Sequence, residues 1–148
     1  MVGFRTPDNV VYLADCLSSR ETLDKYQIGF IYDVGAYLTT LEKVKKAKGQ
    51  NFCASPRRTP LRTLRRWPKY NIDKVKEIAE NIAARCVEPL CFETLLQKLF
   101  TDYNLTMNFE QYVLIGSTVR SYLSWLRDSN EISAFFENNQ LLWRRTAQ

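Results

Sequence analysis

The second half of the chain carries the pattern that most limits how it can fold: three apolar stripes at helical spacing. Asn71 precedes the first stripe, Pro89 the second and Asn108 the third. Asparagine caps helices, and proline is tolerated in a first helical turn. We therefore predict three amphipathic helices beginning at these residues. Their inward positions are Ile72, Val75, Ile78, Ile82 and Cys86; Leu95, Leu96, Leu99, Phe100 and Tyr103; and Phe109, Tyr112, Val113, Gly116, Val119, Leu123 and Leu126.

Two short apolar runs follow the third predicted helix. They are ISAFFE, from Ile132, and QLLWRR, from Gln140, and Asn138-Asn139 stands between them. Asparagine accepts the backbone conformations that a tight hairpin turn needs, so we predict a β-hairpin. Three helices followed by a hairpin is the order of a winged-helix domain. We predict such a domain over residues 71–148.

The first part of the chain combines a strand with a helix. Asn9 to Ala14 (NVVYLA) is a short apolar run after a turn signal, typical of a buried strand, and it ends in Asp15. A carboxylate at the end of a buried strand is a frequent position for chemistry, and a surface turn is the alternative. Asp33 can cap a helix whose apolar side chains recur at offsets of three and four. The predicted fold class is therefore α+β.

The segment between these parts, residues 49–70, differs from its neighbours. From Asn51 to Pro68 it contains five arginines, three prolines and no acidic residue. The net charge of the whole chain is +5, so the chain is neutral outside residues 49–68. Three interpretations are open: a basic linker, an arm that binds nucleic acid, or a frame-shifted translation. The arm is the weakest, because Trp67 is its only aromatic that could stack on bases.

Other features of the composition restrict the chemistry. The chain has no histidine, the commonest general base and metal ligand. Its four cysteines form no Cys-x-x-Cys pair, so we predict free thiols in a cytoplasmic protein. We find no apolar run of roughly 18 residues and no signal-peptide pattern at the start, and we therefore expect no membrane association.

The segment from Val2 to Val44 resembles the C-terminal half of a metallo-β-lactamase-fold hydrolase. In that family a strand ends in an aspartate that bridges two metal ions, and Asp15, in YLAD, stands at the matching position. Residues 1–48 are thus identified as a partial metallo-β-lactamase segment. The helices and hairpin from Asn71 onward are similar to the winged-helix tail of some members. The family's His-x-His-x-Asp-His motif is absent from this sequence.

The resemblance implies a metal-dependent hydrolase that acts on a small-molecule substrate. In such enzymes zinc or iron lowers the pKa of bound water, which attacks an ester, thioester, amide or phosphoester. Asp15 is the single metal ligand that the resemblance assigns here, and it assigns no catalytic residue. Zinc takes about four ligands, so we expect the chain as written to bind no catalytic metal and to be inactive alone.

The resemblance also bears on the arginine-rich segment. The family has a strand followed by Pro-x-His where this chain has NFCASPRRTP. With permitted codons, removing one base near codon 49 gives KAKIFVPAHAEP, a strand ending in Pro-Ala-His. Two further removals, near codons 60 and 68, restore the frame before Lys69. We therefore interpret residues 49–70 as a frame-shifted strand and ligand loop, and expect Gly49 to Pro68 to be poorly ordered.

A non-catalytic role of the winged-helix-like domain is the alternative function. Residues 71–148 carry eight basic and ten acidic side chains, which is unfavourable for a non-specific DNA-binding protein. We therefore expect no nucleic-acid partner. We predict instead that this domain mediates the dimerisation of two identical chains or lines a substrate pocket.

Overall fold

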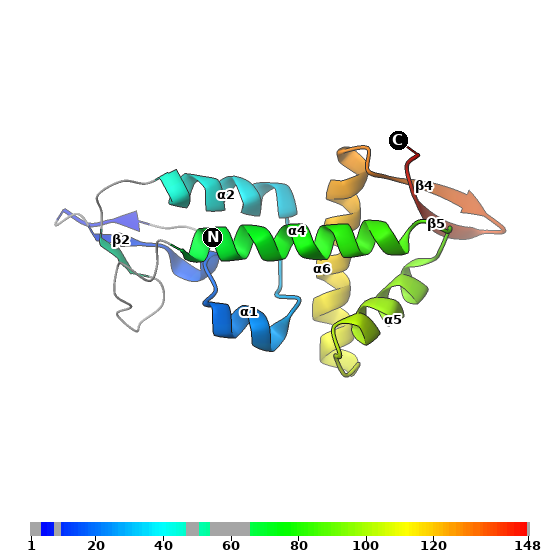
Figure 1. Cartoon of the computed structure of the whole chain (residues 1–148), viewed down its shortest axis with the longest axis horizontal. Coiled ribbons are helices and arrows are strands. Elements are labelled where there is room, and N and C mark those ends of the chain that lie inside the picture. Colours follow the sequence, from blue (N-terminus) through cyan, green and yellow to red (C-terminus); the bar gives the residue numbers. More distant parts are fainter. Residues whose placement is uncertain (1–3, 8–9, 47–50, 54–65, 148) are drawn as a thin grey trace. The chain divides into compact units, whose positions relative to one another are not determined.

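The computed structural model describes residues 4–7, 10–46, 51–53 and 66–147. The chain divides into two compact units, of which the first comprises residues 1–27 and 35–75. The second comprises residues 28–34 and 76–148. Figure 1 follows the chain through both. In the described residues no helix is both long enough and apolar enough to cross a membrane.

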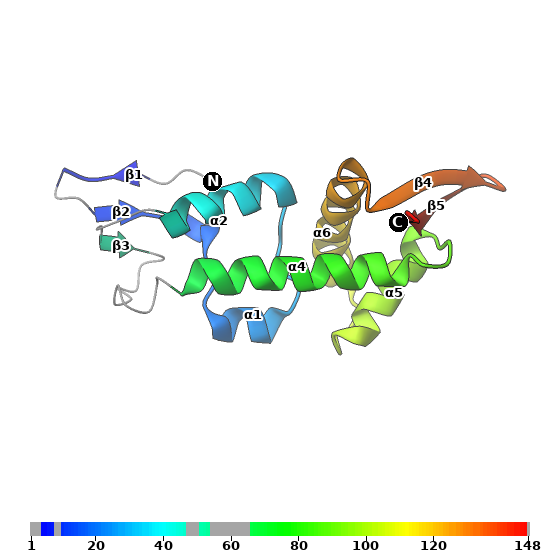
Figure 2. The same cartoon turned by 45° about the horizontal axis from the view of Figure 1, so that its top comes forward.

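The sheet of the first unit is made of three short strands in the order β1-β2-β3, which Figure 2 shows side by side. β1 (Phe4–Arg5) and β2 (Val10–Tyr12) pair antiparallel, and β2 pairs in parallel with β3 (Asn51–Cys53). A strand is confirmed over β2, but the burial predicted for it is wrong: Val10 and Val11 are half-buried, and Tyr12 is 39% exposed. The first residue of the predicted strand, Asn9, lies outside the described residues, and its end is different: Ala14–Cys16 form the short 3-10 helix η1.

Helices pack on one another to form the core of the first unit. α1 (Arg20–Tyr26) is capped by Ser19, whose hydroxyl accepts a hydrogen bond from the Thr22 amide at 3.2 Å. α2 (Val34–Lys46) begins directly after Asp33, as predicted. The buried cluster consists of Leu13, Cys16, Leu17, Leu41 and Ile72, with Val11, Tyr37, Leu38, Val44 and Trp67 packed against it.

α4 (Trp67–Arg85) begins four residues earlier than predicted, so Asn71 does not cap it. Instead the buried Asn71 amide donates hydrogen bonds to the carbonyl oxygens of Trp67 and Ser18, both at 2.8 Å. The prediction failed because a tertiary contact competes with capping: the Asn71 side chain binds the loop around Ser18 instead of the first amides of its own helix. Pro68 fits the first turn, where its missing amide hydrogen costs nothing. The helix belongs to the first unit through Val75 and to the second from Lys76.

The second predicted helix also starts at a different residue. α5 (Phe92–Asp102) follows Cys91 at its N-cap, and Pro89 stands outside it. Leu90, between the two, is held extended because it exchanges two backbone hydrogen bonds with Trp143, at 3.0 and 3.1 Å. A residue paired in this way cannot be helical. The prediction at Pro89 was therefore wrong by three residues.

The remaining elements of the second unit form where the sequence predicts them, but the predicted inward face of α6 (Phe109–Asp128) is wrong over its first turns. Phe109, Tyr112 and Val113 are 78%, 36% and 46% exposed, and the buried face begins at Ile115. α6 is capped by Asn108, whose side chain accepts from the Gln111 amide at 2.8 Å. β4 (Ile132–Glu137) and β5 (Gln140–Arg145) form an antiparallel hairpin. Asn138 and Asn139 adopt φ values of 48° and 60°, as a tight hairpin turn requires.

The arginine-rich segment is described only at its two ends. Asn51–Cys53 form β3, and Trp67 and Pro68 open α4. Residues 47–50 and 54–65 lie outside the described residues. The frame-shift interpretation and the order expected of the segment are untested there.

Candidate functional site

Asp15, the one metal ligand inferred from sequence, lies just beyond the carboxyl end of β2. It is the middle residue of η1, with φ −88° and ψ 24°, and its side chain is exposed. Because β2 and β3 are parallel, their carboxyl ends meet at the same edge of the sheet. This edge is where ligands bind in open sheets built on parallel strands.

The described residues do not by themselves supply a metal centre. Nowhere in residues 4–7, 10–46, 51–53 and 66–147 do three or more His, Cys, Asp or Glu side chains come together in a way that could hold an ion. A zinc or iron site needs about four ligands. Asp15 could contribute one ligand, but this part of the chain does not fit a complete site.

The groups that surround η1 are structural rather than reactive. The thiol of Cys16 is buried, and burial raises its pKa above the ordinary value of a cysteine. Burial likewise raises the pKa of the Tyr37 hydroxyl, which donates a hydrogen bond to Asn71 at 2.9 Å. Both groups therefore stay protonated at neutral pH, and neither can act there as a nucleophile or base.

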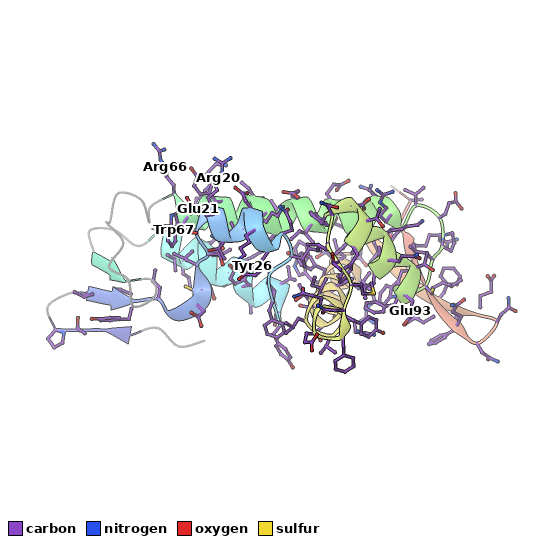
Figure 3. All side chains as sticks on the ribbon, turned by 90° about the horizontal axis from the view of Figure 1, so that it is seen from below. Arg20, Glu21, Tyr26, Arg66, Trp67 and Glu93 are labelled. Atoms are coloured by element: carbon purple, nitrogen blue, oxygen red, sulfur yellow. The ribbon has the colours of Figure 1, made fainter. Side chains whose placement is uncertain are left out.

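The arginines near the start of α4 belong to a solvated surface. Figure 3 shows Arg66 and Arg20 extending outward in the same direction, while the neighbouring Trp67 packs against the core. The Arg20 guanidinium lies 5.7 Å from the centre of the Tyr70 ring and 3.7 Å from the Asp24 carboxylate. These contacts account for Arg20 without a ligand.

A second candidate site, which the sequence analysis did not identify, lies in the second unit. An open groove of about 680 Å³ runs between Phe30–Val34 and the face of α6 from Ser117 to Asp128. The first of these segments has no regular structure before Val34, where α2 begins, so no periodicity marked it. The sequence signal that could have indicated the groove is the spacing of Ser117, Ser121 and Ser124, which leaves a shallow stripe along α6.

One buried hydroxyl fixes the loop side of this groove. Thr118 is fully buried, and its Oγ1 accepts a hydrogen bond from the Ile31 amide at 3.1 Å. The side chains of Phe30 and Tyr32, on either side of Ile31, are 62% and 88% exposed. Trp125 adds a third aromatic group from α6. The groove is therefore anchored by a polar contact and bordered by aromatic rings that face solvent.

Comparison with known proteins gives a relationship at the level of fold. No family model matches the chain, and no curated protein matches it. It is similar to the crystal structure of a beta-lactamase domain protein from Burkholderia ambifaria, with a TM-score of 0.74 and 13% sequence identity. The match covers 97% of this chain and 44% of that one. The chain thus has a mixed α+β fold similar to part of a beta-lactamase domain protein, in agreement with the resemblance of residues 1–48.

Proposed function

We propose that this chain is a portion of a metal-dependent hydrolase of the metallo-β-lactamase superfamily, inactive alone and completed by ligands that it does not contain. The intact enzyme would use zinc or iron and act on an ester, thioester, amide or phosphoester of a small molecule. Asp15 would be one ligand of its metal centre. The similarity to a beta-lactamase domain protein, which extends over 97% of the chain, is consistent with this assignment.

The observation that carries the proposal is the parallel pairing of β2 with β3. The pair aligns Val10 with Asn51 and Tyr12 with Cys53. The restored frame replaces Asn51–Cys53 by Ile-Phe-Val, which suits a strand, and continues directly into Pro-Ala-His. Its histidine would then follow β3 as Asp15 follows β2, and both would belong to the same edge of the sheet.

The winged-helix character of the second unit is part of the same proposal. It is supported by the order α4, α5, α6, β4, β5 and by the backbone pairing of Leu90 with Trp143. Through this single bridge the connection between α4 and α5 lies against β5, beside the two-stranded hairpin. A non-catalytic binding or dimerisation module with this topology is the alternative function.

DNA sequencing combined with metal analysis tests the proposal. We expect reads from upstream of Met1 through codon 70 to show the slipped bases and a coding sequence rich in histidine. The protein made from the corrected reading should bind zinc or iron stoichiometrically and hydrolyse an activated ester or thioester. The chain as written should retain less than about one tenth of an equivalent after dialysis, because one carboxylate is a weak ligand set.

Substitution of Asp15 in the protein made from the corrected reading frame tests whether Asp15 is a metal ligand or an ordinary surface residue. Asp15→Asn should lower both the metal content and the hydrolysis rate, whereas the matched exposed substitution Asp24→Asn should leave both unchanged. Clean reads that confirm the arginine codons would overturn the proposal. So would stoichiometric metal in the chain as written, or an Asp15→Asn protein with unaltered metal content. Salt-dependent binding of the chain as written to duplex DNA would favour the alternative module.

A further inference from the structure

The groove between Phe30–Val34 and α6 has opposite charges near its two ends. Arg120 lines it toward the middle of α6, and Asp128 lines it at the end of the helix. Eight residues separate them, which is about 12 Å along a helix axis. Ser124 stands midway between them and carries a small side chain.

Both charged groups are positioned to meet a partner. The Arg120 guanidinium is stacked on the Phe92 ring, with its carbon 3.7 Å from the ring centre. Stacking uses the face of the guanidinium and leaves its in-plane N–H donors available. Asp128 accepts a hydrogen bond from Arg127 at 3.2 Å, and its side chain is still 65% exposed. The two ends of the groove thus present one accessible cation and one accessible anion.

This arrangement is complementary to itself. Two copies of a helix can pack antiparallel around a two-fold axis that passes beside one central residue. A residue that stands a few positions before the central residue in one copy then lies opposite the residue that stands equally far after it in the other copy. With the axis at Ser124, Arg120 of each copy meets Asp128 of the other. We propose that the groove is the interface of a symmetric dimer of this chain, with α6 packed against α6 of a second copy.

The side chains in the groove fit this occupant. Ser121 and Ser124 lie near the proposed crossing point, and small side chains let two helices approach closely. Phe30 and Tyr32, which are 62% and 88% exposed, would be covered by the second copy. Exposed aromatic clusters of this kind are typical of interaction surfaces. The proposal does not depend on the hydrolase assignment, because every residue that it uses belongs to the second unit.

Charge reversal tests the proposal directly. The Arg120→Glu and Asp128→Arg proteins should each form weaker dimers, with the dissociation constant from sedimentation velocity raised about tenfold or more. The protein that carries both substitutions should return to within about threefold of the parent, because both ion pairs are rebuilt with reversed polarity. Lys76→Glu, a charge reversal on the exposed face of α4, is the matched control and should leave dimerisation unchanged.

Cross-linking tests the register of the two helices and does not depend on the charges. Ser124 would face its own copy across the axis, so Ser124→Cys should give a disulfide-linked dimer on mild oxidation, above the background of the parent chain. Ser117 lies on the same face of α6, but in the proposed dimer it is about 21 Å along the helix axis from Ser117 of the second copy. Ser117→Cys should therefore give no disulfide-linked dimer. A parent chain that is monomeric at 100 µM overturns the proposal. A double charge reversal that stays as weak as the single ones, or equal cross-linking at the two positions, would do so as well.

Discussion

Asn71 and Ser18 lie 53 positions apart in the chain and bind each other through two hydrogen bonds. The Asn71 side-chain amide donates to the Ser18 carbonyl at 2.8 Å, and its Oδ1 accepts from the Ser18 amide at 3.1 Å. The same Oδ1 accepts from the Tyr37 hydroxyl, and the amide also donates to Trp67. One buried side chain therefore connects α4, α2 and the loop that precedes α1.

Replacing Asn71 by alanine should destabilise the first unit strongly. The substitution leaves the Ser18 amide and carbonyl and the Tyr37 hydroxyl without their partner, and each unsatisfied buried group costs about 1 to 3 kcal/mol. We expect a loss of about 3 kcal/mol in the free energy of unfolding, measured by urea denaturation. Tyr37→Phe removes a single one of these bonds and should cost about 1 kcal/mol. Equal losses for the two variants would contradict this account.

The buried Thr118 hydroxyl should be needed to hold the loop segment Phe30–Asp33 against α6. Thr118→Val preserves the shape of the side chain but leaves the Ile31 amide without its acceptor. We expect a loss of about 1 to 2 kcal/mol in chemical denaturation and faster hydrogen exchange at the Ile31 amide. Thr101, whose exposed hydroxyl donates to Gln97 at 3.1 Å, provides the control. Thr101→Val should change stability by less than about 0.5 kcal/mol.

The cysteines should differ in their reactivity toward alkylating agents. A hydrogen bond from Thr94 lowers the pKa of the half-buried Cys91 thiol, whereas burial raises the pKa of Cys86 to about 11. A lower pKa gives more thiolate at a given pH, so at pH 8 iodoacetamide should modify Cys91 at least about tenfold faster than Cys86. Mass spectrometry after tryptic digestion measures both rates. Thr94→Val should slow the modification of Cys91, and an unchanged rate would show that the hydrogen bond has no such effect.

The raised pKa of Cys86 also predicts how stability depends on pH. Above about pH 9 the unfolded chain releases the Cys86 proton, while the folded chain holds it up to about pH 11. The stabilising contribution of this thiol is thus complete below pH 9 and is lost as the pH rises through 11. Its slope is at most about 1.4 kcal/mol per pH unit. Cys86→Ala should have a flatter profile than the parent between pH 9 and 11 in thermal unfolding, and parallel profiles would refute the assignment.

The hairpin turn should respond to substitution according to backbone conformation. Asn139 has φ 60°, a conformation that glycine adopts without strain and a β-branched residue does not. Asn139→Gly should leave the stability of the second unit unchanged or raise it by about 0.5 kcal/mol, because Asn-Gly is the preferred sequence of such turns. Asn139→Val should lower it by about 1 to 2 kcal/mol. Equal Tm values for the two variants would rule out the positive φ.

The sequence predicted those features that depend on local chemistry. Asn108 was identified as a helix cap because an asparagine before an apolar stripe satisfies the first amides of a helix, and it does so here. The hairpin was identified from Asn138 and Asn139 for an equally local reason. By contrast, Asn71 fitted the same capping rule, but its side chain binds Ser18. A contact between residues so distant in sequence cannot be read from periodicity.

The candidate sites were predictable to different degrees. The position of Asp15 after a strand followed from the apolar run before it, although the turn into η1 did not. The groove of the second unit depends on Ile31 and Thr118, whose hydrogen bond joins segments 87 positions apart. The error in the predicted start of α5 has the same origin. Backbone pairing with Trp143 holds Leu90 extended, so the helix begins at Phe92 and not at Pro89.

The parallel pairing of β2 with β3 has a consequence for the order of events as the chain folds. Residues 13–50 separate these two strands, whereas Asn138 and Asn139 alone separate β4 from β5. Joining the more distant pair costs on the order of 2 to 3 kcal/mol more in chain entropy. We therefore expect the β2–β3 pair of the first unit to form more slowly than the β4–β5 hairpin, and the edge of β2 to stay unpaired and open to association with other chains for longer.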